Sequence, residues 1–318
     1  MLGMTSIYNN PSTYGEDASV IDIGESRYLV QNIDVFTPIV DDPETQGRIA
    51  ACNITNDLFA CGVLNVTTML SFLATPVDVP KWALAGILNG MQAFANDLGT
   101  TITKGQTIQN PWILVGGAAS GFVEKENLIT HAGVKPGDSI ILTKPLGIQA
   151  IMALSRLIKN PEVADSLLEA LSSDEFEPTI QRAIDLMTTS SKPVVEVIRS
   201  LAAKEPGEFK VHSMTDVTGF GLAGHAENLA AASGVDIVIT LLPALNHAFK
   251  LSELFGYPLD EGRAHETAGG MLVAIAKEDE QRFVKAMDDA GITGHVVGRA
   301  VKGTGTAFLS DHVEYVET

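Results

Sequence analysis

The order of apolar and polar positions predicts alternating strands and helices in the first part of the chain. Short apolar runs at 20–23 and 28–33 flank a Gly24 turn, which is typical of a hairpin. Apolar residues recur at helical spacing over 46–60, and the stretch 80–98 reads as an amphipathic helix that begins at proline. Further strands are predicted at 69–73, 102–103 and 113–123, with a polar loop between the last two.

A second set of strands and helices follows a turn-rich stretch at 133–138. We expect a strand at 139–143, mainly helices over 148–201, a strand–helix–strand unit over 209–240, and a strand, helix and strand at 270–276, 278–290 and 294–301. The pattern predicts an α+β or α/β protein of two layered domains, an N-terminal domain over 1–130 and a C-terminal domain over 131–318.

Composition narrows the function. The chain has 318 residues, 45% of them hydrophobic, and a net charge of -18. This charge argues against nucleic acid or an anionic membrane as a partner, so an anionic substrate would need metal ions as intermediaries. Two cysteines, no signal sequence and no apolar run of membrane-spanning length predict a cytoplasmic protein.

Four aspartates at loop or element-end positions are candidate metal ligands: Asp17, Asp34, Asp57 and Asp216. Carboxylate oxygens are the ligands that Mg²⁺ prefers, and several converging aspartates could hold ATP phosphates without a basic clamp. An aspartate beside a strand end is more often a turn former or helix cap, so only their joint placement favours a site.

The two commonest phosphate-binding loops, the P-loop and the kinase glycine loop, are absent. Gly105, Gln106 and Thr107 are predicted to form a turn whose N–H groups can face an anion, although an ordinary turn between strands fits equally well. The stretch 216–225 is predicted to be a strand end that turns into a helix, with 265–270 a turn near the same cleft. His225 is interpreted as a packed helix residue rather than a ligand.

Cys52 and Cys61 lie in an apolar, helix-like stretch of the sequence. Their thiols should have ordinary or raised pKa values and behave as small apolar groups, so neither is a candidate nucleophile.

Six motifs resemble, in order and over nearly the whole chain, those of the selenophosphate synthetases (selenide, water dikinases). They are FTPIVDDP at 36–43, GRIAA at 47–51, NITNDLFACG at 53–62, GQTIQNPW at 105–112, TKPLG at 143–147 and MTDVTGFG at 214–221. That family is grouped with aminoimidazole ribonucleotide synthetase, thiamine monophosphate kinase and the hydrogenase-maturation dehydratase, which share a two-domain α/β fold.

The resemblance implies an ATP- and Mg²⁺-dependent enzyme that makes selenophosphate from selenide and water and releases phosphate and AMP. It also implies a homodimer formed through the sheet of the first domain. The implied magnesium ligands are Asp17, Asp57 and Asp216, with Asp34 at a position for both ATP phosphate and metal. The implied ATP contacts are Tyr14, Gly15, Glu16, Asp34 and Asp57, with Gly105, Gln106 and Thr107 reaching the partner subunit's nucleotide.

Two features depart from the family pattern. The N-terminal loop that carries a Cys or Sec and an ATP-contacting Lys is missing from this chain, and Lys104 stands where the family usually has glycine. We therefore expect no catalytic nucleophile in the chain, and interpret it as a truncated, impaired form of a longer protein; a naturally short homologue is the other interpretation.

Two other functions remain open at this stage. One is a sister enzyme such as thiamine monophosphate kinase, against which the Asn110–Pro111–Trp112 motif and the TGFG sequence at 218–221 argue. The other is a catalytically altered Mg–ATP-binding dimer that regulates selenium metabolism. Retained aspartates predict metal binding in both the enzyme and the regulator, so they do not separate these two.

Overall fold

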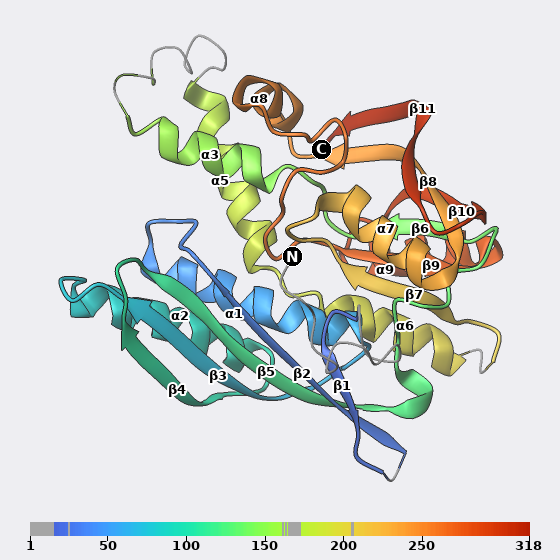
Figure 1. Ribbon diagram of the computed structural model, residues 1–318, viewed down its shortest axis with the longest axis horizontal. Coiled ribbons are helices and arrows are strands. Elements are labelled where there is room, and N and C mark those ends of the chain that lie inside the picture. Colours follow the sequence, from blue (N-terminus) through green and yellow to red (C-terminus); the bar gives the residue numbers. More distant parts are fainter. Residues whose placement is uncertain (1–15, 25, 161, 163, 165–172, 205–206) are drawn as a thin grey trace, which may run out of the picture.

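The computed structural model describes residues 16–24, 26–160, 162, 164, 173–204 and 207–318, with only the backbone of 173–176, and these form two layered α/β domains (Figure 1). In the first domain one five-stranded sheet has the order β1-β2-β5-β3-β4. Its elements are β1 (Ser19–Asp22), β2 (Arg27–Phe36), α1 (Pro43–Ala60), β3 (Val66–Thr75), α2 (Lys81–Asp97), β4 (Ile102–Gln109), β5 (Leu114–Glu124) and the 3₁₀ turn η2 (Lys125–Asn127).

Local sequence explains how α1 starts and how closely it packs. Asp42 caps the helix by accepting a hydrogen bond from Thr45 N at 2.8 Å, and Pro43 occupies the first turn, where it has no hydrogen bond to lose. The pairing of α1 with α2 depends on two glycines. A Cβ on Gly47 would lie 2.0 Å from Ile87 O, and one on Gly90 would lie 1.8 Å from Glu44 O. Only glycine lets the two backbones approach so closely.

The second domain is built on a six-stranded sheet of order β11-β8-β10-β6-β9-β7, in which β8 and β11 run parallel and the other pairs antiparallel. Its strands are β6 (Ser139–Leu142), β7 (Val211–Asp216), β8 (Val235–Ala244), β9 (Met271–Ile275), β10 (His295–Lys302) and β11 (Ala307–Glu317). Its helices are α3 (Ile148–Leu157), α5 (Ser173–Thr188), α6 (Lys192–Lys204), α7 (Gly221–Ser233), α8 (Ala248–Phe255), α9 (Glu280–Asp289) and the 3₁₀ turn η3 (Lys277–Asp279).

The predicted fold class is confirmed, but one local prediction is wrong. The predicted turn at Gly105, Gln106 and Thr107 lies inside β4, which pairs in parallel with β3, with Gly105 opposite Ser71. β4 is an edge strand, and an edge tolerates glycine and polar residues that an interior strand would not. Two elements were not predicted, α8 and β11.

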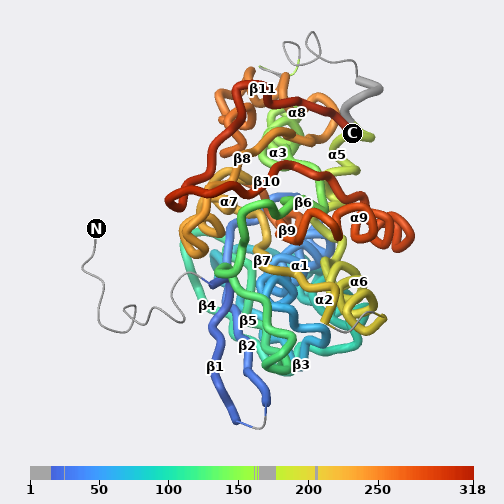
Figure 2. Tube along the Cα trace, turned by 90° about the vertical axis from the view of Figure 1, so that its right-hand side faces the viewer, coloured from blue at the N-terminus to red at the C-terminus, as the bar shows by residue number. Residues whose placement is uncertain are grey.

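Helix α1 lies between the two domains, as Figures 1 and 2 both show. One side of it packs on β2 and β5 of its own sheet, and the other contacts α5, α6 and β7 of the second domain. Four of its buried residues are polar, namely Gln46, Asn53, Thr55 and Asn56. Polar side chains on a buried helix need partners, and the partners of the two asparagines are in the functional site described next. No helix in the described part of the chain is long and apolar enough to cross a membrane.

Candidate metal centre

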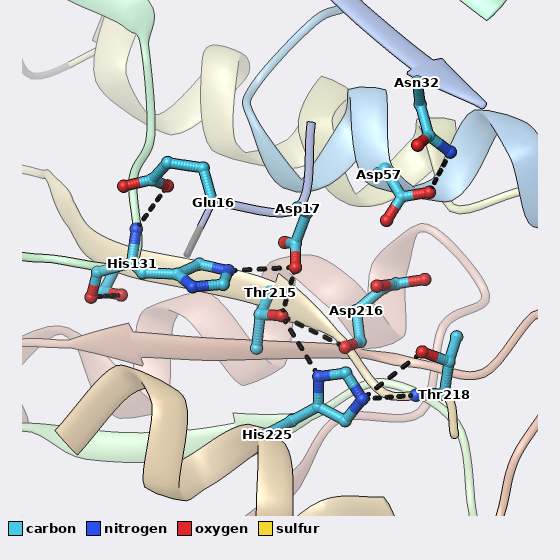
Figure 3. A network of polar contacts seen from close by, with 10 residues as sticks. Glu16, Asp17, Asn32, Asp57, His131, Thr215, Asp216, Thr218 and His225 are labelled. Carbon is cyan, nitrogen blue, oxygen red and sulfur yellow. Dashed lines mark hydrogen bonds and ion pairs between the residues drawn. The ribbon is translucent and has the colours of Figure 1, made fainter. Parts of the chain in front are cut away.

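Three aspartates from distant parts of the sequence meet at the junction of the domains (Figure 3). Asp17 precedes β1, Asp57 lies near the end of α1, and Asp216 is the last residue of β7. One carboxylate oxygen from each lies within 4.8 Å of the other two. These are the three residues that the family resemblance implied as magnesium ligands.

The cluster has the chemistry of a site for a hard cation. Asp17 Oδ2 and Asp216 Oδ2 are buried and make no hydrogen bond to any described residue. Buried polar atoms normally have partners, so two orphaned carboxylate oxygens beside each other indicate a ligand that the protein itself does not supply. Carboxylate oxygens suit Mg²⁺, and the donor set therefore fits this ion.

Electrostatics point the same way. Burial raises the pKa of Asp57 well above its ordinary value, and the negative charges of Asp216, Asp17 and Asp34 raise it further. The pKa of Asp216 is also raised well above its ordinary value, first by burial and then by Asp17 and Asp34. Without a bound cation, ionising all of these buried carboxyl groups at once has a high free-energy cost.

Asp34 lies beside the cluster but outside it. Burial raises its pKa, and its Oδ2 accepts a hydrogen bond from Asn53 Nδ2 at 2.5 Å. The other side of the Asn53 amide accepts a hydrogen bond from Ala268 N at 2.8 Å, and Asn56 Nδ2 donates to Gly269 O at 3.2 Å. As expected, the 265–270 turn packs near the site, and the two asparagines join it to the first domain.

His131 contacts the cluster through Asp17. Its Nε2 lies 2.9 Å from Asp17 Oδ1, and its backbone N–H donates to Glu16 Oε2 at 2.8 Å. Burial alone would lower the pKa of His131, but contact with Asp17 and the charges of Glu16 and Asp216 outweigh burial and raise the pKa. The His131 ring thereby fixes one oxygen of Asp17 and leaves the other without a partner among the described residues.

Thr215 links the neutral His225 to Asp17, as Figure 3 shows. Thr218 N donates to His225 Nε2 at 3.0 Å, so this nitrogen carries no proton. Burial lowers the pKa of His225 to about 4, which keeps the ring neutral. The ring lies 3.5 Å from the Thr215 hydroxyl, which donates to Asp17 Oδ1 at 2.8 Å. The interpretation of His225 as a hydrogen-bonded helix residue agrees with these contacts.

The other predicted residues are placed as follows. Tyr14 and Gly15 lie outside the described residues. Gly105 lies on the same register row as Asp34, but three strands away, which is roughly 14 Å at the usual strand spacing. The structure therefore does not bring the 105–107 segment to the cluster of its own subunit. Cys52 and Cys61 are buried and unpaired, and burial raises the pKa of both thiols.

Two buried ionisable residues around the site were not predicted from the sequence. Lys144 donates to three carbonyl oxygens, those of Leu186, Thr189 and Ala268, at 2.7 to 2.8 Å. Glu266 accepts hydrogen bonds from Gly147 N at 2.7 Å and Ile148 N at 2.9 Å, at the start of α3. Both residues lie in stretches that the sequence analysis names, but no local pattern distinguishes a buried lysine or glutamate from an exposed one.

Comparison with known proteins agrees with this arrangement. Residues 15–123 match the family described as AIR synthase related protein, N-terminal domain, and residues 135–310 match its C-terminal domain. The solved structures of similar fold include AaThiL complexed with AMPPCP and TMP, with a TM-score of 0.73 and 21% identity over 97% of this chain and 92% of that one. Another is the hydrogenase maturation protein HypE in complex with ATP, with a TM-score of 0.68 and 17% identity over 92% of this chain and 84% of that one. At such identities the likeness shows the fold alone.

Sequence relatives are more specific. Selenide, water dikinase of Methanocaldococcus jannaschii is 41% identical over 304 residues, which cover 95% of this chain and 85% of the relative. The enzyme of the same description from Methanococcus maripaludis is also 41% identical, over 95% of this chain and 89% of the relative. With both AIR synthase related domains present and this identity over nearly its whole length, the chain belongs to the selenide, water dikinase family.

Proposed function

We propose that this protein uses ATP and water to convert selenide to selenophosphate, with release of phosphate and AMP. The observation that carries the proposal is the cluster of Asp17, Asp57 and Asp216 at the domain junction of a chain that belongs to the selenide, water dikinases. One oxygen each of Asp17 and Asp216 has no partner among the described residues. In an acidic protein without a P-loop or kinase glycine loop, metal ions held by these aspartates would supply the positive charge that the ATP phosphates need at this site.

Asp17, Asp57 and Asp216 would hold Mg²⁺, with Asp34 beside them for the ATP phosphates. Bound Mg²⁺ would neutralise charge on the phosphates that are cleaved. The protein's own residues orient these ligands. His131 and Thr215 hold one oxygen of Asp17, and Asn32 donates a short hydrogen bond to Asp57 Oδ2. Neither buried cysteine is placed to handle selenium.

A homodimer would form through the outer face of the first sheet. Helices α1 and α2 cover the other face, whereas Ile33, Leu70, Ile108 and Phe122 on this one are 42 to 74% exposed. A patch of this kind on a folded domain favours a protein partner, and a second copy satisfies it symmetrically. In such a dimer, Gly105, Gln106 and Thr107 of one subunit would approach the nucleotide of the other. We propose residue 130 as the domain boundary and the cytoplasm as the location.

The proposal is tested by anaerobic ³¹P NMR of the protein with Mg–ATP and selenide, together with Mg–ATP titrations. We expect Mg–ATP binding by the wild type and its loss in Asp216→Asn. Selenophosphate, phosphate and AMP are the products that the NMR spectra would identify. The exposed Asp78→Asn is the matched control and should behave as wild type. Unchanged nucleotide affinity in Asp216→Asn would contradict the site. ATP binding by the wild type without cleavage would favour a regulatory dimer.

A further inference from the structure

A second cavity lies between the domains, at the far end of β2 from the hairpin. Its volume is about 280 Å³, and it is bounded by the segment after β2, by one side of α3 and by the loop around 257–267. The polar groups that line it are Thr37, Gln149, Arg156, Tyr257, His265 and Thr267. None of them has been assigned a role above.

The lining offers hydrogen-bond donors that no described residue of the protein uses. Gln149 accepts from His265 N through Oε1 at 2.9 Å, which leaves its amide N–H groups free. The guanidinium of Arg156 makes one long contact, 3.4 Å, to Pro38 O, and no ion pair with a described residue. Within the described chain, the hydroxyls of Thr37, Tyr257 and Thr267 and the ring of His265 make no hydrogen bonds.

Among the described residues that line the cavity there is no carboxylate, although the whole chain carries a charge of -18. Other surface cavities of this protein are lined by acidic groups, for example Glu253 and Asp260 in one and Glu196 and Asp289 in another. The buried Glu266 lies between two lining residues in sequence, but its carboxylate is turned to the first backbone N–H groups of α3. The cavity is therefore rich in donors and cationic, the opposite of the aspartate cluster.

The cavity is also connected to that cluster. Phe36, on its wall, lies two residues beyond Asp34 on the same face of β2, a separation of roughly 7 Å. On the other side, Thr267 precedes Ala268, whose N–H is held by Asn53, and Asn53 also donates to Asp34. A ligand released at Asp34 thus lies roughly 7 Å along β2 from one wall of this donor-lined space.

We propose that this cavity binds a phosphate oxyanion, and specifically the phosphoryl product, orthophosphate or selenophosphate, as it leaves the aspartate cluster. The inference rests on the proposed function for the identity of the ligand. A phosphate oxyanion is mainly a hydrogen-bond acceptor with a negative charge. The guanidinium, amide and hydroxyl donors match it, and no described lining residue offers a competing carboxylate. The volume suits an ion of this size with accompanying water.

Calorimetric titration of the metal-free protein in EDTA with inorganic phosphate tests this proposal. Without Mg²⁺ the aspartate cluster repels phosphate, so binding reports on the cavity. We expect Arg156→Gln to weaken phosphate binding about tenfold and Thr267→Val about threefold, as lost charged and neutral hydrogen bonds do. Arg299→Gln removes one exposed positive charge elsewhere in the same domain and should leave phosphate binding unchanged. Thermal unfolding checks that each variant is folded.

Three results would overturn the proposal: no phosphate binding in the absence of Mg²⁺, equal phosphate affinity in Arg156→Gln and wild type, or an equal loss in Arg299→Gln. Titration with AMP separates the two sources of phosphate. A loss in Arg156→Gln confined to AMP would assign the cavity to the nucleotide and overturn the product assignment. Failure of the wild type to cleave ATP would instead contradict the proposed function, and the phosphate titration would remain readable.

Discussion

Asp57 lowers the stability of the metal-free protein but supplies a carboxylate for metal binding. Its pKa is raised by burial and by three neighbouring carboxylates, so the metal-free protein keeps this group at a cost. We expect Asp57→Asn to raise the melting temperature of the metal-free protein by several degrees, because the amide carries no charge to bury or repel. The same variant should lose the further stabilisation that Mg²⁺ gives to the wild type.

Thermal unfolding with EDTA and with Mg²⁺ measures both effects. Asp78→Asn, which replaces an exposed aspartate of the same domain, is the control and should change neither value. If Asp57→Asn destabilised the metal-free protein, or if it kept the full response to Mg²⁺, the account of mutual repulsion at a shared metal site would be wrong.

Glu266 should make the folded state less stable as the pH rises, whereas a carboxyl group whose pKa falls on folding makes it more stable. Burial raises its pKa from 4.5 to about 8, against two backbone hydrogen bonds that lower it. Between these pH values the folded state holds a proton that the unfolded state has lost. The stability from this group is therefore complete below about pH 4.5 and is lost as the pH rises to about 8.

Glu266→Gln cannot ionise and should lack this dependence. From pH 5.5 to 7.5, the free energy of unfolding of the wild type should fall by roughly 3 kcal/mol relative to the variant, at about 1.4 kcal/mol per pH unit. Urea unfolding at several pH values measures the difference. The exposed Glu253→Gln should run parallel to the wild type, and an equal slope in Glu266→Gln would place the titration elsewhere.

The sequence predicted which aspartates converge better than it predicted what surrounds them. The aspartates were visible because they sit in ordered motifs that resemble those of a known family. Asp17, Asp57 and Asp216 indeed converge. The roles of His131 and Lys144 depend on partners far away in the chain, since His131 meets Asp17 and Lys144 meets Ala268. Such contacts leave no local pattern, because any buried histidine or lysine would look the same.

At the scale of elements, the contact of α1 with α2 decides where the asparagines and Asp57 point. Gly90→Ala would place a Cβ 1.8 Å from Glu44 O, so the helices must separate. We expect a loss of about 1 to 3 kcal/mol in unfolding free energy, as for other overpacked cores, and weaker Mg–ATP binding. Asn89→Ala, an exposed neighbour on α2, is the control and should change neither measurement. Urea unfolding of Gly90→Ala that matches the wild type would show that the helices separate freely.

Hydrophobic periodicity located most elements because their buried faces repeat regularly along the chain. The periodicity did not identify elements that bury only one side or few of their residues. β4 lies at a sheet edge and is exposed over almost its whole length, so its glycine and glutamine resembled a turn. β11 is also an edge strand, with a largely exposed pattern, and α8 spans only eight residues. Their positions are set by pairing with β8 and by packing on α3, which a local pattern does not contain.

The molecule as a whole places its metal centre where neither domain is complete alone. Asp17 and Asp57 come from the first domain and Asp216 from the second, and α1 packs against both. The two asparagines bind the 265–270 turn across the same junction, and Lys144 binds that turn from within the second domain. Metal binding should therefore stabilise the contact between the domains, since both domains supply carboxylates to the ion.

The outer face of the first sheet carries the remaining prediction about the whole molecule. Ile33 is 74% exposed on this face and pairs with Ala118 of β5, whose partner on the other side is Leu70 of β3. A carboxylate there cannot be buried against a second copy without a large desolvation cost, so Ile33→Glu should convert the proposed dimer to a monomer. The fold should persist, because the side chain is solvent-exposed in one subunit.

Sedimentation velocity measures the change from dimer to monomer. Val77→Glu, at a loop residue that is 80% exposed, is the control and should remain dimeric. A wild-type protein that sediments as a monomer would rule out this face as a stable interface, and ATP cleavage by monomeric Ile33→Glu would show that the partner's β4 is not needed for catalysis.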